Sequence, residues 1–368
     1  MTAVLLLVAC RTDPIVAAER FFATRPVYER PLDAGRAPAD LDLRASSCGA
    51  CHPDAYAEWQ VSTHAHAWKD PQLQAEMTKS ENRWMCQNCH APLMVQQAAW
   101  PSALVDGDVE KPVWVENPAF DEDLREEGIT CAACHLRDGV IHGPTGVATS
   151  AHETRADADF TGTGLCERCH EATATYPGKG FVCTFQTGTE LAAGPYGQGG
   201  ATCQMCHMPA VTRPDGTLAH RHWWPGGGIP KVAGVGPPAD ALPVGLRVAV
   251  AQEGAELRVD LVNAAAGHML PTGDPERFYR VALTFDTGAS WEHRIGQTWE
   301  WWPEPKKLAD NRIPPGTSRA ERVPVPPGAT AVELVVTRHR MTAEAAAFHH
   351  LDGYPTDAEV ERRTIPLR

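Results

Sequence analysis

The sequence predicts an α+β protein in which a mainly helical and loop-rich region is followed by a small all-β sandwich. A cysteine–histidine motif recurs five times between residues 48 and 207. A stretch rich in Gly and Pro follows, and beyond it apolar and polar residues alternate in short runs, as in strands with one buried face. We therefore expect a motif-bearing domain at 44–228, a linker at 229–242, a β-sandwich at 243–345 and a C-terminal tail at 346–368.

The composition excludes some classes of protein. The 368 residues carry a net charge of −13, from 46 acidic and 33 basic residues, which argues against a nucleic-acid partner. The longest fully apolar run, residues 3–10, is far shorter than a membrane-spanning helix.

The N-terminus resembles the end of a bacterial lipoprotein signal. Residues 7–10 read Leu-Val-Ala-Cys, a box that is cleaved before a lipidated cysteine, although the usual basic segment before it is missing. We expect residues 1–10 to be an export signal, Cys10 to be lipidated and residues 11–43 to form a tether. An ordinary export signal is the alternative.

The five motifs share the form C-x-x-C-H, and a random sequence of this composition would contain about 0.02 of them. They are Cys48-Gly-Ala-Cys51-His52, Cys86-Gln-Asn-Cys89-His90, Cys131-Ala-Ala-Cys134-His135, Cys166-Glu-Arg-Cys169-His170 and Cys203-Gln-Met-Cys206-His207. Two thiols at this spacing can each add to one vinyl group of a haem, and the adjoining histidine then ligates the iron. The motifs therefore predict five haem c groups.

Other uses of paired cysteines explain the pattern less well. A closed zinc site normally combines two pairs, five is an odd number, and zinc gives no reason for a histidine after every pair. A disulfide framework leaves the histidines unexplained as well.

Local signals predict the elements around and after the motifs. Pro53 favours a helix start, and the following residues suit a helix. Period-two alternation in 246–250, 257–261, 281–285 and 332–336 predicts strands of a sandwich of about seven strands. Residues 342–348 suit one short helix.

The motif-bearing region resembles the multihaem cytochrome c554 family, relatives of the electron acceptor of hydroxylamine oxidoreductase. The resemblance covers about residues 44–225, and it rests on residues 48–68, on residues 128–144 and on Gly200-Ala-Thr-Cys-Gln-Met-Cys-His-Met-Pro209. Residues 263–273 resemble a module that follows the haem region in many such cytochromes. The resemblance implies electron transfer through closely packed haems, mostly with two axial histidines each, although the namesake has four motifs.

The resemblance also implies two distal ligands. His64 lies in the Trp-x-x-Ser-x-His pattern that the family uses, and His142, followed by Gly-Pro, matches another. If the helix from Pro53 continues to His64, that residue lies about 18 Å from His52, so it should ligate a neighbouring haem rather than its own.

Three further histidines are candidate ligands from their own positions. His222 follows the last motif closely and is preferred to His220, whereas His152 is a candidate with a surface histidine as the alternative. His268 lies between a Gly and a Pro-Thr-Gly turn in the strand-rich region, and we expect it to reach back to a haem.

Electron transfer is the function that these features favour, and a catalytic role is the weaker expectation. Five haems of about −1 each would bring the net charge to about −18, which favours redox partners with a basic docking face. We expect a periplasmic or cell-surface protein, lipid-anchored to a bacterial membrane. The alternatives are a haem enzyme acting on a small nitrogen or sulfur compound at one open iron, and a subunit of a haem filament.

Overall fold

The computed structural model describes residues 15–17, 31–36, 38, 41–79, 84–176, 180–238, 240–241, 243–301 and 305–368. The expected export signal with Cys10, and much of the expected tether, lie outside these residues. The described parts of the tether join the motif-bearing region, because β1 (Ile15–Ala17) pairs with β2 (Ala99–Val105) and Leu32 forms a bridge with Leu93. No helix in the described residues is long and apolar enough to cross a membrane.

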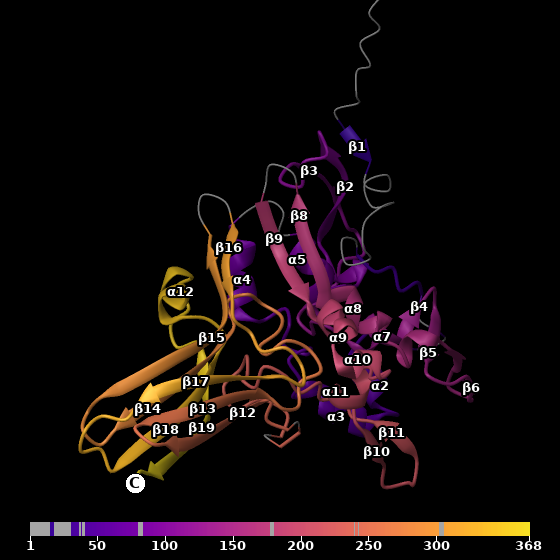
Figure 1. Ribbon diagram of the computed structural model, residues 1–368. Helices are drawn as coiled ribbons and strands as arrows, with labels where there is room; N and C mark the ends of the chain where they lie inside the picture. Colours follow the sequence, from indigo (N-terminus) through magenta and orange to yellow (C-terminus); the bar gives the residue numbers. More distant parts are fainter. Residues whose placement is uncertain are drawn as a thin grey trace, which may run out of the picture.

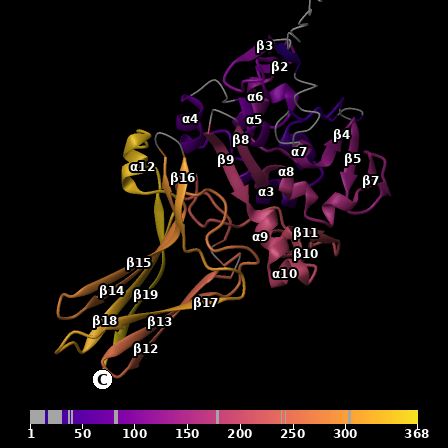
Figure 2. The ribbon, with the colours of Figure 1, turned by 45° about the horizontal axis from the view of Figure 1, so that its top comes forward.

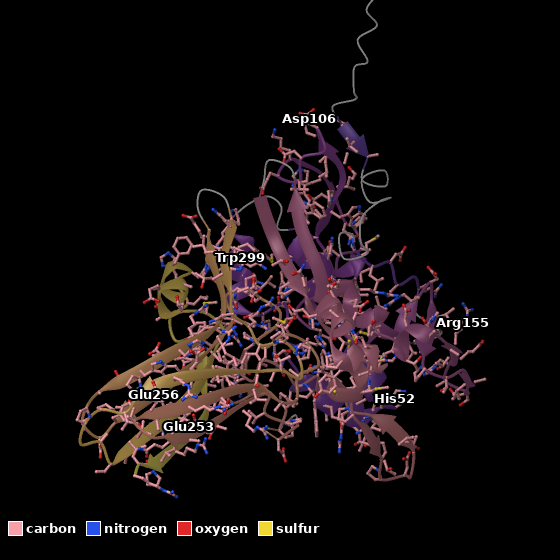
Figure 3. The ribbon with its side chains drawn as sticks, in the orientation of Figure 1. His52, Asp106, Arg155, Glu253, Glu256 and Trp299 are labelled. Carbon is pink, nitrogen blue, oxygen red and sulfur yellow. The ribbon has the colours of Figure 1, made fainter. Side chains whose placement is uncertain are left out.

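The chain folds into a half that bears the motifs and a strand-rich half, which lie side by side (Figures 1 and 2). Figure 3 places His52 in the first half, and Glu253 and Glu256 at the far end of the second. The structure contains both helices and many strands, as the α+β class predicts.

Short helices carry the motifs. Four helices contain a whole motif: α5 (Trp84–His90), α7 (Cys131–His135), α8 (Gly164–His170) and α11 (Cys203–His207). α2 (Ala45–Gly49) contains only the start of the first motif, and Cys51 and His52 follow it. Residues three apart lie on one face of a helix, so a helical turn presents both thiols of a motif on the same side. The other helices are α3 (Pro53–Gln60), α4 (Pro71–Met77), α6 (Glu122–Arg125), α9 (Thr187–Ala193) and α10 (Pro195–Gln198), with 3₁₀ turns at Met94–Gln96 and Ala158–Phe160.

Helix α3 begins at Pro53, as predicted, but it ends at Gln60. The assumption of an unbroken helix to His64 is therefore wrong. A run of turns over residues 61–69 separates His64 from α3, which lets its ring leave the helix direction.

The motif-bearing half also contains several β-hairpins, which the expectation of a mainly helical and loop-rich region did not include. β2 pairs with β3 (Pro112–Glu116), and β4 (Leu136–Arg137), β5 (Val140–Gly143), β6 (Val147–Ala148) and β7 (Glu153–Ala156) form a small sheet. β8 (Glu171–Tyr176) pairs with β9 (Gly180–Gln186), and β10 (Ala210–Thr212) pairs with β11 (Leu218–His220). The β-branched and aromatic residues of β8 and β9 favour strands, although neither segment shows a long run of alternating apolar and polar residues.

Two antiparallel sheets form the strand-rich half. The smaller contains β12 (Leu246–Glu253), β13 (Glu256–Asn263) and β17 (Ser318–Pro324). The larger contains, in spatial order, β16 (Lys306–Asp310), β15 (Ser290–Glu300), β14 (Phe278–Phe285), β18 (Ala331–His339) and β19 (Asp357–Pro366). Alternate residues of both sheets, such as Leu257, Leu283 and Leu334, meet in one buried core.

The segment at 346–368, expected to be a tail, mostly forms regular structure, and its residues Val360, Ile365 and Leu367 pack against this core while only partly buried. Its residues form β19, which pairs with β18 along its length and completes the larger sheet. Helix α12 (Ala343–Phe348) lies where a short helix was predicted, and Thr342 caps it by accepting the N–H of Ala345.

Candidate haem-binding site

Each of four motif histidines faces a second histidine ring. The ring centroids of His52 and His152 lie 6.4 Å apart, and those of His64 and His170 lie 6.3 Å apart. The corresponding distance is 6.3 Å for His135 with His222 and 6.4 Å for His207 with His268. None of the four pairs comes from one motif, so each joins distant segments of the chain.

These separations match two imidazoles on one metal ion. A metal–nitrogen bond of about 2.0 Å plus roughly 1.15 Å from that nitrogen to the ring centroid, taken twice, gives about 6.3 Å. The rings are too far apart for direct stacking at van der Waals distance, and the repeat of one value at four places indicates a common geometry. The donor sets of the four pairs therefore fit haem iron with two axial histidines.

Hydrogen bonds to Nδ1 orient several of these rings. The Nδ1 atom of His135 lies 2.8 Å from the carbonyl oxygen of His142, and the Nδ1 atom of His207 lies 2.5 Å from the carbonyl oxygen of Pro225. The Nδ1 atom of His268 lies 2.9 Å from the carbonyl of Met269. An N–H at Nδ1 that donates to a carbonyl leaves Nε2 unprotonated and available to a metal.

Burial keeps three of the paired rings neutral, which ligation requires. Burial, with the charges of His170 and His90, lowers the pKa of His64 to about 3. Burial also lowers the pKa of His170 to about 4, and that of His222 to about 4.

The loop that carries His268 is fixed by Asn263, a buried residue at the end of β13. Its side-chain amide donates to the carbonyls of His268 (2.9 Å) and Ile313 (3.0 Å), and its Oδ1 accepts the N–H of Ala266 (3.1 Å). One side chain thus sets both ends of the turn that presents His268.

A buried ion-pair network docks this loop on the motif-bearing half. Arg312 donates to Glu190 of α9 (2.6 Å) and makes two bonds of 2.9 Å with Asp310. Thr272 donates to the second oxygen of Glu190 at 2.5 Å. The pairing of His268 with His207 therefore depends on contacts between the two halves.

His222 is held by Glu58, a carboxylate only 5% exposed. Glu58 accepts from the guanidinium groups of Arg213 (2.7 Å) and Arg221, and from the backbone N–H of His222 (2.8 Å). Burial opposes ionisation of Glu58, but these bonds outweigh it and lower the pKa to about 2. The nearby His220 instead places Nδ1 2.7 Å from the carbonyl of Met208.

The structure gives His142 a different environment from the expected one. In the described part of the chain its ring does not lie against that of a motif histidine, and its Nδ1 lies 3.1 Å from Asp157. Its carbonyl accepts from the ring of His135. His142 thus orients the third motif, a role that the sequence pattern did not indicate.

The second motif differs from the other four. All sixteen histidines of the chain lie in described residues, and none of their rings faces that of His90 in the way seen in the four pairs. His90 does have the usual orienting contact, because its Nδ1 lies 3.0 Å from the carbonyl of Ala67. Among the five motif histidines, His90 is therefore the one whose ring faces no second histidine ring among the described residues.

Thiols of different motifs lie next to each other. Side-chain hydrogen bonds join Cys48 to Cys131, Cys89 to Cys169 and Cys166 to Cys203. The first motif thus borders the third, and the fourth borders both the second and the fifth. The remaining motif cysteines are Cys51, Cys86, Cys134 and Cys206, and none of the ten forms a disulfide.

Comparisons with known proteins agree with this layout at the level of the fold. No protein-family model matches the chain, and no curated protein does either. Among solved structures, the chain is similar to a penta-haem cytochrome c552 from Thermochromatium tepidum, with a TM-score of 0.61 and 17% sequence identity. The match covers 93% of this chain and 100% of that chain, so both halves share the fold of a multihaem cytochrome c.

Proposed function

We propose that the chain is a multihaem c-type cytochrome that carries single electrons through five covalently bound haems. The observation that carries the proposal is the separation of 6.3–6.4 Å in four histidine pairs, each of which includes a motif histidine. The likeness in fold to a penta-haem cytochrome supports it.

The histidines support electron transfer at four of the haems. Iron with an imidazole on each face has no open position, so it changes charge without binding a substrate. The contacts between cysteines of neighbouring motifs support haems packed closely enough to exchange electrons.

A second function is favoured by His90, because its iron lacks a second histidine. A haem with a free position can bind a small molecule, so catalysis on a small nitrogen or sulfur compound is the alternative at this one site. Assembly into a haem filament also stays open as an alternative.

The cellular location that we propose follows from covalent haem attachment, which requires export of the chain. We propose a periplasmic or cell-surface location, lipidation of Cys10 as the membrane anchor, and basic redox partners that match the net charge of −13.

Haem and ligand counts test the proposal. Pyridine haemochrome assay and intact mass should give five haems per chain, and the oxidised protein should show mostly low-spin ferric signals in electron paramagnetic resonance. Reduced protein should bind no more than one carbon monoxide per chain. Fewer than five haems, or carbon monoxide at several haems, would contradict the proposal.

A further inference from the structure

A cluster of buried and partly buried basic side chains lies where the strand-rich half meets α4. Its members, here called the cation cluster, are Lys231, Arg277, Arg338 and Arg340. Arg340 donates to the carbonyl of Ile229 at 2.7 Å, and its guanidinium lies 4.6 Å from the centre of the Tyr354 ring. The guanidinium of Arg338 packs directly on Gly228, where a Cβ would collide with it. Burial, with the charges of Arg340 and Arg277, lowers the pKa of Lys231 to about 7.

Acidic groups only partly balance the cation cluster. Asp70, which is 3% exposed, pairs with Lys231 and accepts the hydroxyl of Tyr354 at 2.6 Å, and Asp274 lies near Arg277. Burial and the charge of Asp274 raise the pKa of Glu276 to about 7, so this carboxyl is only partly ionised at neutral pH. Three guanidinium groups, which stay charged, and Lys231 therefore face the carboxyl groups of Asp70 and Asp274 and the partly ionised Glu276.

Two donors of the cation cluster also lack a partner. The Nε atom of Arg338 and the Nη1 atom of Arg340 are buried without a hydrogen bond to any described residue, and Arg340 is only 7% exposed. A buried donor without an acceptor is costly, and more so when it is charged. The cation cluster is therefore short of both negative charge and hydrogen-bond acceptors.

The cation cluster lies near the facing pair His64 and His170. The charge of Lys231 acts on His64, and that of Arg277 acts on His170. The charge of His90 also acts on His64, so the second motif lies close to this pair. An anion bound by the cation cluster would therefore lie near the haem proposed between His64 and His170, with the haem proposed at His90 close by.

We propose that the cation cluster is a buried binding site for oxyanions, formed between the two halves of the chain. The inference rests on the proposed function and deepens it. The oxyanion has two sources with the same chemistry: the propionates of the neighbouring haems, or a small free oxyanion that reaches the iron of His90. In either case a guanidinium binds two oxygens of the anion side by side, as it does with carboxylates.

Arg277 gives the sharpest test, because no hydrogen bond of its guanidinium to a described residue would be lost with it. Arg277→Gln removes the charge, Arg277→Lys keeps it, and Lys231→Gln provides a second neutral variant if the first does not fold. The matched control is Arg322→Gln on β17, whose side chain is 54% exposed and pairs with surface glutamates. All are made in the full chain, and their haem content is measured first.

The two sources give different results. If propionates occupy the site, loss of a positive charge favours ferric iron. At least one midpoint potential should then fall by the equivalent of roughly a tenfold change in the ferric-to-ferrous ratio, which is 59 mV for one electron. If a free oxyanion occupies it, titration of the wild type with sodium nitrite should saturate a change in the haem spectrum, and Arg277→Gln should raise the Kd at least tenfold. Arg277→Lys and Arg322→Gln should stay near the wild type in both assays.

The inference is overturned if both neutral variants, with full haem content, keep wild-type potentials and a wild-type response to nitrite. A wild type with fewer than five haems would instead contradict the proposed function. The two failures are therefore distinguishable.

Discussion

Replacing His268 by alanine tests whether a residue of the strand-rich half completes a haem in the other half. The rings of His268 and His207 lie 6.4 Å apart, so a single iron bound between them would have both axial positions filled. Alanine ends at Cβ and cannot reach the iron, which then has one free position. We expect the number of carbon monoxide molecules bound per reduced chain to rise by one.

The number of carbon monoxide molecules that the reduced wild type binds depends on the second motif. If the iron at His90 is open, the wild type binds one carbon monoxide and His268→Ala binds two. The oxidised variant should also gain a high-spin ferric signal that corresponds to one haem in five. The matched control is His293→Ala, because this histidine of the same half stacks on Trp291, at 5.8 Å, and faces no motif histidine. The reasoning is refuted if His268→Ala, with five haems, binds the same amount of carbon monoxide as the wild type and shows no new high-spin signal.

Three further changes test how the halves and the ligands are held. Asn263→Ala removes one buried and two partly buried hydrogen bonds and should lower the free energy of unfolding by about 2–4 kcal/mol in chemical denaturation; a loss below about 0.5 kcal/mol would contradict this. Arg312→Ala leaves two carboxylates at the interface without their partner and should cost about 3–5 kcal/mol; Arg322→Gln is the exposed control, and equal losses in both would count against a docking role. The lowered pKa of Glu58 stabilises the fold above pH 4.5, its ordinary pKa, and this contribution is lost as the pH falls towards 2. Between these values the wild type should lose about 3 kcal/mol more than Glu58→Gln, and parallel acid-denaturation curves would argue against it.

Local patterns were enough to predict some elements of the fold. Pro53 starts a helix because its ring presets the backbone dihedral of a first helical turn. The alternating runs at 246–250, 257–261, 281–285 and 332–336 all lie in strands, since one face of each is buried in the common core. In contrast, β19 has mostly polar residues and was expected to be a tail, because its burial comes from pairing with β18 and not from its own pattern.

In the candidate site, too, local patterns predict some residues, whereas tertiary packing decides the others. The proximal residues follow from the spacing within a motif, because covalent attachment needs both thiols and the histidine within five residues. Distal partners such as His152 and His268 come from segments 100 and 61 residues from the histidines they face, respectively, and no local rule specifies such pairs.

The sequence by itself determined the donor groups of this protein: five motifs whose cysteines and histidine suit covalent haem, and a surplus of histidines from which second ligands can come. Only the tertiary structure decided which histidines face each other, and that His142 and His90 stand outside the four pairs. The physical reason is that an axial ligand must lie within about 2 Å of an iron, and a contact this short between distant segments depends on how the whole chain packs. Asn263, Glu58 and the ion pairs of Arg312 set that packing, each through partners that lie far away in the sequence.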